Sequence, residues 1–196
     1  MLATADGFIR WYRESGVTSV FAEQVALFEA HGMALVHPVR GQAVVLDIEG
    51  EQVLMRQEEL DRLLGLRIAS LTMEWWLTAD TNVIDEYAYQ PFGCEIQTLW
   101  LDGLHTDEAR RVESAVIAAT TQLPIPTHAV VIDRRGTSDP DDWDSLMLYD
   151  GAKVPRFPDV VIAQEPIVEK IMRATPGLAQ ESVGDYLTRL APARQA

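Results

Sequence analysis

The stretch SLTMEWWLT, residues 70–78, constrains the fold more than any other part of the sequence. Within it, two sets of side chains alternate along the chain: Leu71, Met73, Trp75 and Leu77 against Thr72, Glu74, Trp76 and Thr78. Successive side chains of a β-strand point to opposite faces of its sheet. The pattern therefore predicts a strand with one apolar face in the core and a second face that is wet or covered by something polar.

The segments around this strand predict further strands joined by short turns. Strands are expected at residues 33–38, 42–56, 83–89, 94–101, 128–133 and 159–163, with 42–56 a hairpin that turns at Glu49-Gly50. Helices are expected from Thr4 or Asp6 to Glu14, from Thr18 or Ser19 to Gly32, and over 57–65, 106–122, 165–174 and 181–190. Because the middle strands meet through short turns, we predict an α+β fold with an antiparallel or mixed β-sheet covered by helices.

A soft boundary near Arg67 divides this pattern in two. Residues 1–67 are predicted to form an N-terminal helical and β-hairpin region packed on the rest, and residues 68–196 an α+β main domain.

The charge balance limits the classes of partner. The chain has 196 residues, of which 30 are acidic and 16 basic, and its net charge is −14. Phosphate backbones and anionic membrane surfaces are bound through clustered Lys and Arg, so we expect no nucleic acid and no membrane as partner. The single cysteine, Cys94, excludes an intrachain disulfide and favours a reducing, cytoplasmic location. We see no secretory signal, and prolines and polar residues interrupt the uncharged segment 114–132, so we expect no membrane span.

One interval combines acidic and aromatic residues. Between Arg67 and Arg110 the chain has no Lys or Arg but eight acids, together with the aromatic residues Trp75, Trp76, Tyr87, Tyr89, Phe92 and Trp100. Alternation sends Trp75 to the core and Trp76 to the other face with Glu74. Trp76 is then either covered by a second layer, such as the N-terminal helices, or part of a binding patch for a cation. We predict such a patch at Trp76, Glu74, Glu86 and Glu95.

The stretch TSDPDDWDSLMLYDG, residues 137–151, has the acidity of a calcium loop. An EF-hand loop that began at Asp139 would have Asp141 and Asp150 at ligand positions 3 and 12. However, Trp143 would stand at ligand position 5 and Asp144 at the position that requires Gly. Ser138 or Asp139 as N-cap, followed by Pro140 and two acids, is instead typical of a helix start, so we expect no metal site here.

The segment VVIDRRGT, residues 130–137, resembles the first motif of haloacid dehalogenase-like phosphatases, in which a strand ends in Asp-x-Asp-Gly-Thr. Asp133, Gly136 and Thr137 match, and the resemblance implies Asp133 as the nucleophile. Arg135 stands where the family has its second Asp, the general acid, and only about sixty residues follow the motif. We therefore predict that Asp133 is not a nucleophile.

No other combination of residues predicts a catalytic, metal or cofactor site. The four histidines lack metal-ligand spacing, Cys94 lacks a nucleophile signature, and no phosphate loop is present. Our first hypothesis is an interaction protein that binds a basic protein partner, by analogy with the immunity proteins that neutralise toxins. The alternative is an enzyme or ligand-binding protein for a small organic or cationic substrate, with Glu74, Glu86 or Glu95 as acid or base.

Overall fold

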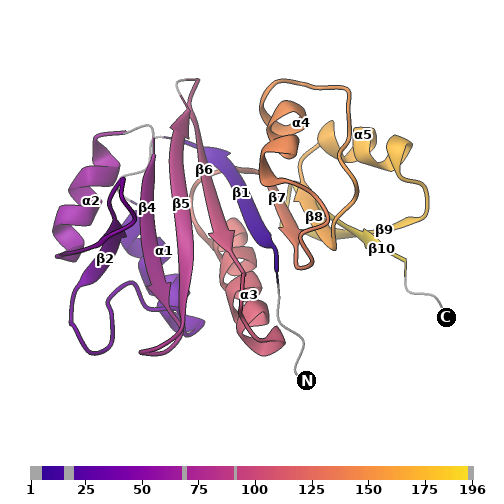
Figure 1. The fold of residues 1–196 in the computed structure, drawn as a ribbon. Coiled ribbons are helices and arrows are strands. Elements are labelled where there is room, and N and C mark those ends of the chain that lie inside the picture. The colour runs from indigo at the N-terminus through magenta and orange to yellow at the C-terminus, as the bar shows by residue number, and fades with distance from the viewer. Residues whose placement is uncertain (1–5, 16–19, 68–69, 91, 194–196) are drawn as a thin grey trace.

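The computed structural model describes residues 6–15, 20–67, 70–90 and 92–193. These residues form one ten-stranded sheet in the order β3-β2-β4-β5-β6-β1-β7-β8-β10-β9, and every neighbouring pair of strands is antiparallel (Figure 1). The predicted α+β class is confirmed, and the sheet is antiparallel rather than mixed. The strands are β1 (Phe8–Glu14), β2 (Ala43–Leu46), β3 (Gln52–Met55), β4 (Leu71–Trp76), β5 (Asn82–Gln90), β6 (Cys94–Trp100), β7 (Thr127–Asp133), β8 (Val160–Ala163), β9 (Leu178–Val183) and β10 (Leu187–Pro192).

Five α-helices and one 3-10 helix accompany the sheet in the described part of the chain. They are α1 (Phe21–Ala30), α2 (Gln57–Gly65), α3 (Thr106–Gln122), the 3-10 helix η1 (Pro140–Trp143), α4 (Asp144–Leu148) and α5 (Ile167–Ala174). The predicted hairpin at residues 42–56 and the helices over 57–65 and 106–122 are confirmed. The proposed caps Thr4, Thr18 and Ser19 lie outside the described residues.

The helix predicted from Thr4 or Asp6 to Glu14 is wrong. Residues 8–14 form β1, which lies in the middle of the sheet and pairs with β6 on one side and β7 on the other. Every side chain from Phe8 to Arg13 is buried. A strand covered on both faces shows no alternation of polar and apolar residues, which explains why its period could not be recognised. β1 comes from the first 67 residues, whereas both of its neighbours come from the remainder.

The helix predicted over residues 181–190 is also wrong. β9 and β10 form a hairpin there, with Val183 opposite Leu187 and Gly184 at a positive φ of 62° in the turn. Val183, Leu187 and Leu190 have helical spacing in the sequence. In the structure, Leu187 and Leu190 belong to the two different cores on the two faces of the sheet.

The two faces of the sheet are covered to different extents. Helices α1, α2 and α3 pack on one face, which we call the α1–α3 face. Helices η1, α4 and α5 pack on the other, the α4–α5 face, over β1, β6, β7, β8 and β10. Figure 1 shows α4 and α5 over the β7–β8 end of the sheet, whereas no helix lies in front of β5. The β5 side of the α4–α5 face therefore has no helical layer, and we call it the uncovered half of this face.

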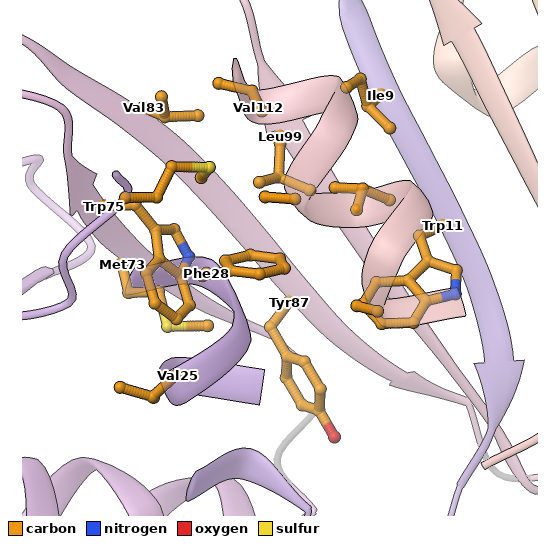
Figure 2. Close-up of a cluster of buried hydrophobic side chains, with 14 of the residues drawn as sticks. Ile9, Trp11, Val25, Phe28, Met73, Trp75, Val83, Tyr87, Leu99 and Val112 are labelled. Carbon is orange, nitrogen blue, oxygen red and sulfur yellow. The ribbon is translucent and has the colours of Figure 1, made fainter. Parts of the chain in front are cut away.

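The larger core lies between β4, β5, β6 and the helices α1 and α3. Figure 2 shows Phe28 of α1 beside Trp75, with 4.7 Å between the ring centroids. Leu71, Met73, Trp75 and Leu77 are all buried, as the alternation in residues 70–78 predicts. Fully burying one such side chain contributes about 1.5–3 kcal/mol, so this strand face is a main source of stability.

Residues 33–42 cross the end of the sheet beside β4 without forming a regular strand. The strand predicted at residues 33–38 is reduced to two isolated bridges, between Ala34 and Trp76 and between Val36 and Ala43. This segment carries His37 to the α4–α5 face, where it packs on Trp76. Among the described residues, no helix is both long and apolar enough to cross a membrane.

Candidate functional site

Strand β4 places Trp76 on the α4–α5 face, but the ring is covered. Trp76 is 7% exposed, and the imidazole of His37 lies 4.2 Å from it between ring centroids. The cover thus comes from the loop after α1, whereas α1 itself packs on Trp75. The indole Nε1 of Trp76 is buried and has no hydrogen-bond partner among the described residues. Such a group is costly to bury, because it gives up its hydrogen bond to water.

The three glutamates predicted with Trp76 have different environments. Glu74 lies on the same face but is 3% exposed, and the Gln52 side-chain amide donates to both of its carboxylate oxygens at 3.1 Å. Glu86 also lies on this face, opposite Thr72 on β4, and is exposed. Glu95 points to the α1–α3 face, where it is 5% exposed and accepts from Arg13 Nε at 3.2 Å. The structure therefore brings Trp76, Glu74 and Glu86 to one face and separates Glu95 from them.

A pocket of about 380 Å³ lies on the uncovered half of the α4–α5 face. Alternate residues of β5 supply three of its lining side chains, the last residue of β6 supplies an aromatic ring, and the next turn supplies a second carboxylate: Asn82, Ile84, Glu86, Trp100 and Asp102. Its volume falls in the lower part of the range typical of ligand sites. It combines an apolar floor with two carboxylates and an amide, which is suited to a ligand with an apolar stem and a cationic end.

The charges around this pocket are negative. None of its lining residues is Lys or Arg. Partial burial, together with the neighbouring carboxylate of Asp6 and a hydrogen bond to it, raises the pKa of Asp102. The carboxyl groups of Asp6 and Asp102 repel each other when both are ionised, and a bound cation would relieve this repulsion.

Arg10, which is separated from Glu86 by one strand on this face, is already neutralised. Thr98 lies opposite Glu86 on one side and opposite Arg10 on the other. The Arg10 guanidinium donates to Asp144 at 3.0 and 2.7 Å and to the Thr98 hydroxyl at 2.9 Å, and its Nε also donates to the Tyr12 hydroxyl at 3.0 Å. Asp141 adds an ion pair at 3.1 Å. Each nitrogen of the Arg10 guanidinium therefore has a partner other than the pocket carboxylates.

The Asp-rich stretch thus has two structural roles. Asp139 caps η1, because its carboxylate accepts from the backbone N–H of Asp141 at 2.9 Å, and Pro140 follows at the first helical position. This confirms the predicted helix start. Asp141 and Asp144 bind Arg10, which joins this end of α4 to the middle of the sheet. Among the described residues, no group of three or more His, Cys, Asp or Glu side chains could hold a metal ion.

Asp133 organises the loop that follows β7. One of its oxygens accepts four hydrogen bonds at 2.8–2.9 Å, from the backbone N–H and hydroxyl groups of Thr137 and Ser138, and the other accepts from Arg135 N at 3.2 Å. Burial on its own would raise the pKa of Asp133, but these donors outweigh it and lower the pKa. The resemblance to the phosphatase motif therefore has a structural explanation in this loop.

Gly136 has a similar explanation. Its φ is 58°, and a Cβ at this position would lie 2.4 Å from the backbone oxygen of Asp6, so only glycine fits.

A buried polar network lies between the sheet and α1. Gln24 of α1 accepts from Arg13 Nη1 at 2.7 Å and donates to the Gln97 side chain at 3.1 Å. Gln97 and the Trp75 indole both donate to one oxygen of Asp85, at 2.7 and 2.8 Å. The other oxygen of Asp85 has no partner among the described residues. Burial raises the pKa of Asp85 to about 6, although these two donors oppose the shift.

Two further features, Cys94 and a second pocket, are weaker candidates for a functional site. Cys94 is buried, and burial raises the pKa of its thiol to about 11, so it is not a ready thiolate nucleophile. A second pocket of about 420 Å³ beside α5 includes Lys170 and Arg173, but Lys170 pairs with Asp150 and Arg173 pairs with Glu169. The cations of this pocket are therefore already neutralised.

The interval between Arg67 and Arg110 contains the pocket, although only Glu86 of its five lining residues was predicted as a site residue and the other four were not. Trp100 and Asp102 belong to the acidic and aromatic set of that interval, and Asn82 and Ile84 share a face of β5 with Glu86. Alternation along β5 and β6 was the signal that could have grouped them. Comparison with protein-family models, with curated proteins and with solved structures finds no match to this chain.

Proposed function

We propose that this protein is a binding protein that recognises a basic segment of a protein partner through the uncovered half of its α4–α5 face. The observation that carries the proposal is the pocket at Glu86, Trp100 and Asp102, which pairs an aromatic ring with two carboxylates and has no basic lining residue. Attraction by the ring and by the carboxylates acts on the same cation. The net charge of −14 attracts a basic partner at longer range.

The geometry favours binding over the enzymatic alternative. An acid–base mechanism would require the predicted carboxylates to converge on one reacting group. Glu74 is held by Gln52, and Glu95 is held by Arg13 on the opposite face. Of the three predicted glutamates, only Glu86 lines the pocket, and the cysteine thiol lies buried elsewhere. The partner predicted from the sequence, a basic protein in the cytoplasm, is therefore retained in the proposal, in the manner of an immunity protein and its toxin.

Affinity capture with matched charge variants tests the proposal. The wild-type chain, a Glu86→Lys/Asp102→Lys variant and a Glu29→Lys/Glu58→Lys control are used as bait in native lysate. Glu29 and Glu58 are exposed residues of α1 and α2, so the control has the same net charge as the pocket variant. We expect a basic protein to be retained by the wild type and the control but lost from the pocket variant. Equal retention by the pocket variant, or an acidic captured protein, would contradict the proposal.

A further inference from the structure

We infer that the pocket receives the side chain of an arginine of the partner, with the guanidinium between Glu86 and Asp102 and the methylene stem along Ile84 and Trp100. This inference rests on the proposed function, since it names the chemical group that the basic partner presents. The lining supplies each part that such a side chain needs. Ile84 and the Trp100 ring offer apolar contact, and the two carboxylates and the Asn82 side chain offer hydrogen-bond acceptors.

The same face already holds one guanidinium in a comparable setting. Arg10, which is 8% exposed, is bound by the carboxylate of Asp144 through two of its nitrogens and by the hydroxyl groups of Tyr12 and Thr98. Thr98 separates Arg10 from Glu86 in the register of β1, β6 and β5. Because Arg10 is itself paired, it leaves the pocket carboxylates available to a second guanidinium.

The lining favours arginine over lysine for two physical reasons. A planar guanidinium can stack on an indole ring while its edge donates to carboxylates, whereas an ammonium is a compact point charge. The guanidinium is also less strongly hydrated, so it loses less on entering a pocket with an apolar floor. Trp100 provides the ring, which is partly exposed and touches Phe8 edge-on, with 6.3 Å between centroids.

The Asp6–Asp102 pair points to the same class of ligand. The carboxyl groups of Asp6 and Asp102 can share a hydrogen bond when one of them is protonated, and they repel each other when both are ionised. A guanidinium beside Asp102 would offset that repulsion. Binding would then favour the ionised form of the pair and release protons, and the affinity for arginine should rise with pH in the acid range.

Nuclear magnetic resonance titration of the full chain can test this inference with three small probes. These are the Nα-acetyl amides of arginine, lysine and citrulline, the last being the uncharged near-isostere of arginine. The reporter is the indole N–H signal of Trp100, identified by its loss in Trp100→Phe. We expect saturable shifts with the arginine probe, binding at least about threefold weaker with lysine, and no saturable shift with citrulline. Asp102→Asn and Glu86→Gln should each weaken arginine binding about threefold or more, whereas Glu29→Gln should leave it unchanged.

The outcomes separate this inference from the proposed function. Equal affinity for arginine and lysine, or no movement of the Trp100 signal with either, overturns the inference. In that case, capture of a basic protein that depends on Glu86 and Asp102 would still support the proposed function. Conversely, arginine binding without any captured basic protein would support the pocket chemistry and contradict the proposed function. A spectrum with native dispersion shows that each variant is folded.

Discussion

Trp75 and Trp76 are neighbours in the sequence, yet their indole N–H groups have opposite environments. The N–H of Trp75 donates to Asp85 at 2.8 Å, whereas that of Trp76 has no partner among the described residues. Both rings are buried, Trp75 under α1 and Trp76 under His37. Burial alone therefore does not distinguish the two residues. The hydrogen bond of Trp75 to Asp85 should make their contributions to stability differ.

Substitution by phenylalanine tests this difference. Trp75→Phe removes one of two donors to a buried carboxylate, so it should cost about 1–3 kcal/mol more than Trp76→Phe, which leaves no group newly unpaired. Both alanine variants should cost several kcal/mol, on the order of 3–5 for Trp75→Ala. Urea unfolding of the four variants measures these differences. Equal costs for the two phenylalanine variants would mean that the bond to Asp85 does not contribute.

Asp85 should make the stability of the protein depend on pH. Its pKa is about 6 in the folded protein, because burial disfavours the charged form. In the unfolded chain an Asp has a pKa of about 4, so between these values the folded state binds more protons. The contribution of Asp85 to stability is thus fully present below about pH 4 and lost as the pH rises through 6.

The Asp85→Asn variant should avoid this loss, because it carries no charge. Relative to the wild type, its unfolding free energy should rise by about 3 kcal/mol between pH 4 and pH 7. Urea titrations of both proteins at several pH values within that range provide the measurement. A difference that stays constant across the range would show that Asp85 is not held at a raised pKa.

At the scale of the element, Asp133 is the centre of the loop between β7 and η1. The charged form of its side chain accepts five hydrogen bonds, and these lower its pKa. Asp133→Asn replaces one acceptor oxygen by a donor group and should cost about 2–3 kcal/mol at neutral pH. The pKa of Asp133 is lower in the folded protein than in the unfolded chain. The loss of stability in Asp133→Asn should therefore shrink as the pH falls through the folded-state pKa.

A matched control for Asp133→Asn lies in the same loop. Asp139 also accepts from backbone, but as a helix cap, a position at which Asn serves about equally well. Asp139→Asn should therefore change the unfolding free energy by no more than about 0.5 kcal/mol. Neither variant should alter hydrolysis of a generic phosphate ester. A folded Asp133→Asn protein that has lost such an activity would restore the phosphatase interpretation.

An ion pair between Arg10 of β1 and Asp144 of α4 joins this helix to the sheet. The pair is partly screened, because the side chain of Asp144 is 23% exposed. A double-mutant cycle with Arg10→Met and Asp144→Asn should give a coupling energy of about 2 kcal/mol, less than a fully buried pair could give. If the losses of unfolding free energy in the two single variants add up to that of the double variant, the ion pair does not stabilise the contact between α4 and β1.

The sequence predicts elements best where one face of a strand or helix is polar. The alternation in residues 70–78 predicted β4, and the apolar side chains of Val112, Val116 and Ala119, which lie along one side of a helix, predicted the helix over residues 106–122. The prediction for residues 8–14 was wrong because both faces of β1 are buried. Its paired charges, Arg10 and Arg13, resemble solvent-exposed residues in the sequence. The helix predicted over residues 181–190 was wrong because Val183, Leu187 and Leu190 have helical spacing by coincidence, whereas they belong to the hairpin of β9 and β10.

The candidate site could be predicted as a region but not as a set of residues. Alternation correctly put Trp76 and Glu74 on the face opposite Trp75. Both side chains are nevertheless buried, because His37 packs on Trp76 and Gln52 binds Glu74, and these two residues come from a loop and a strand distant in the sequence. Such contacts have no local signal in the chain. Glu86 was predicted, whereas Trp100 was recognised only as one aromatic residue of the interval.

At the scale of the whole molecule, helices α1, α2 and α3 pack on one face of a single antiparallel sheet, and η1, α4 and α5 pack on only part of the other. The pocket is lined by residues from segment 82–102, which belongs to the interval without Lys or Arg, so its lining carries negative charge only. A net charge of −14 also makes the chain repel itself when compact. The charge that would attract the proposed basic partner therefore also lowers the stability of the folded chain.

Salt should therefore stabilise the protein by screening, and calcium should add nothing specific. The carboxylates of Asp141 and Asp144 are paired with Arg10, and Asp139 is occupied as a helix cap. We expect the melting temperature to rise with NaCl as self-repulsion is screened. CaCl2 and MgCl2 at equal ionic strength should give values within about 2 °C of each other, because no group of three or more His, Cys, Asp or Glu side chains among the described residues could hold a metal ion. Differential scanning calorimetry makes the comparison, with MgCl2 as the control for divalent charge. A calcium-specific rise that saturates with concentration, and that is lost in Asp139→Asn, would show a metal site in the Asp-rich stretch after all.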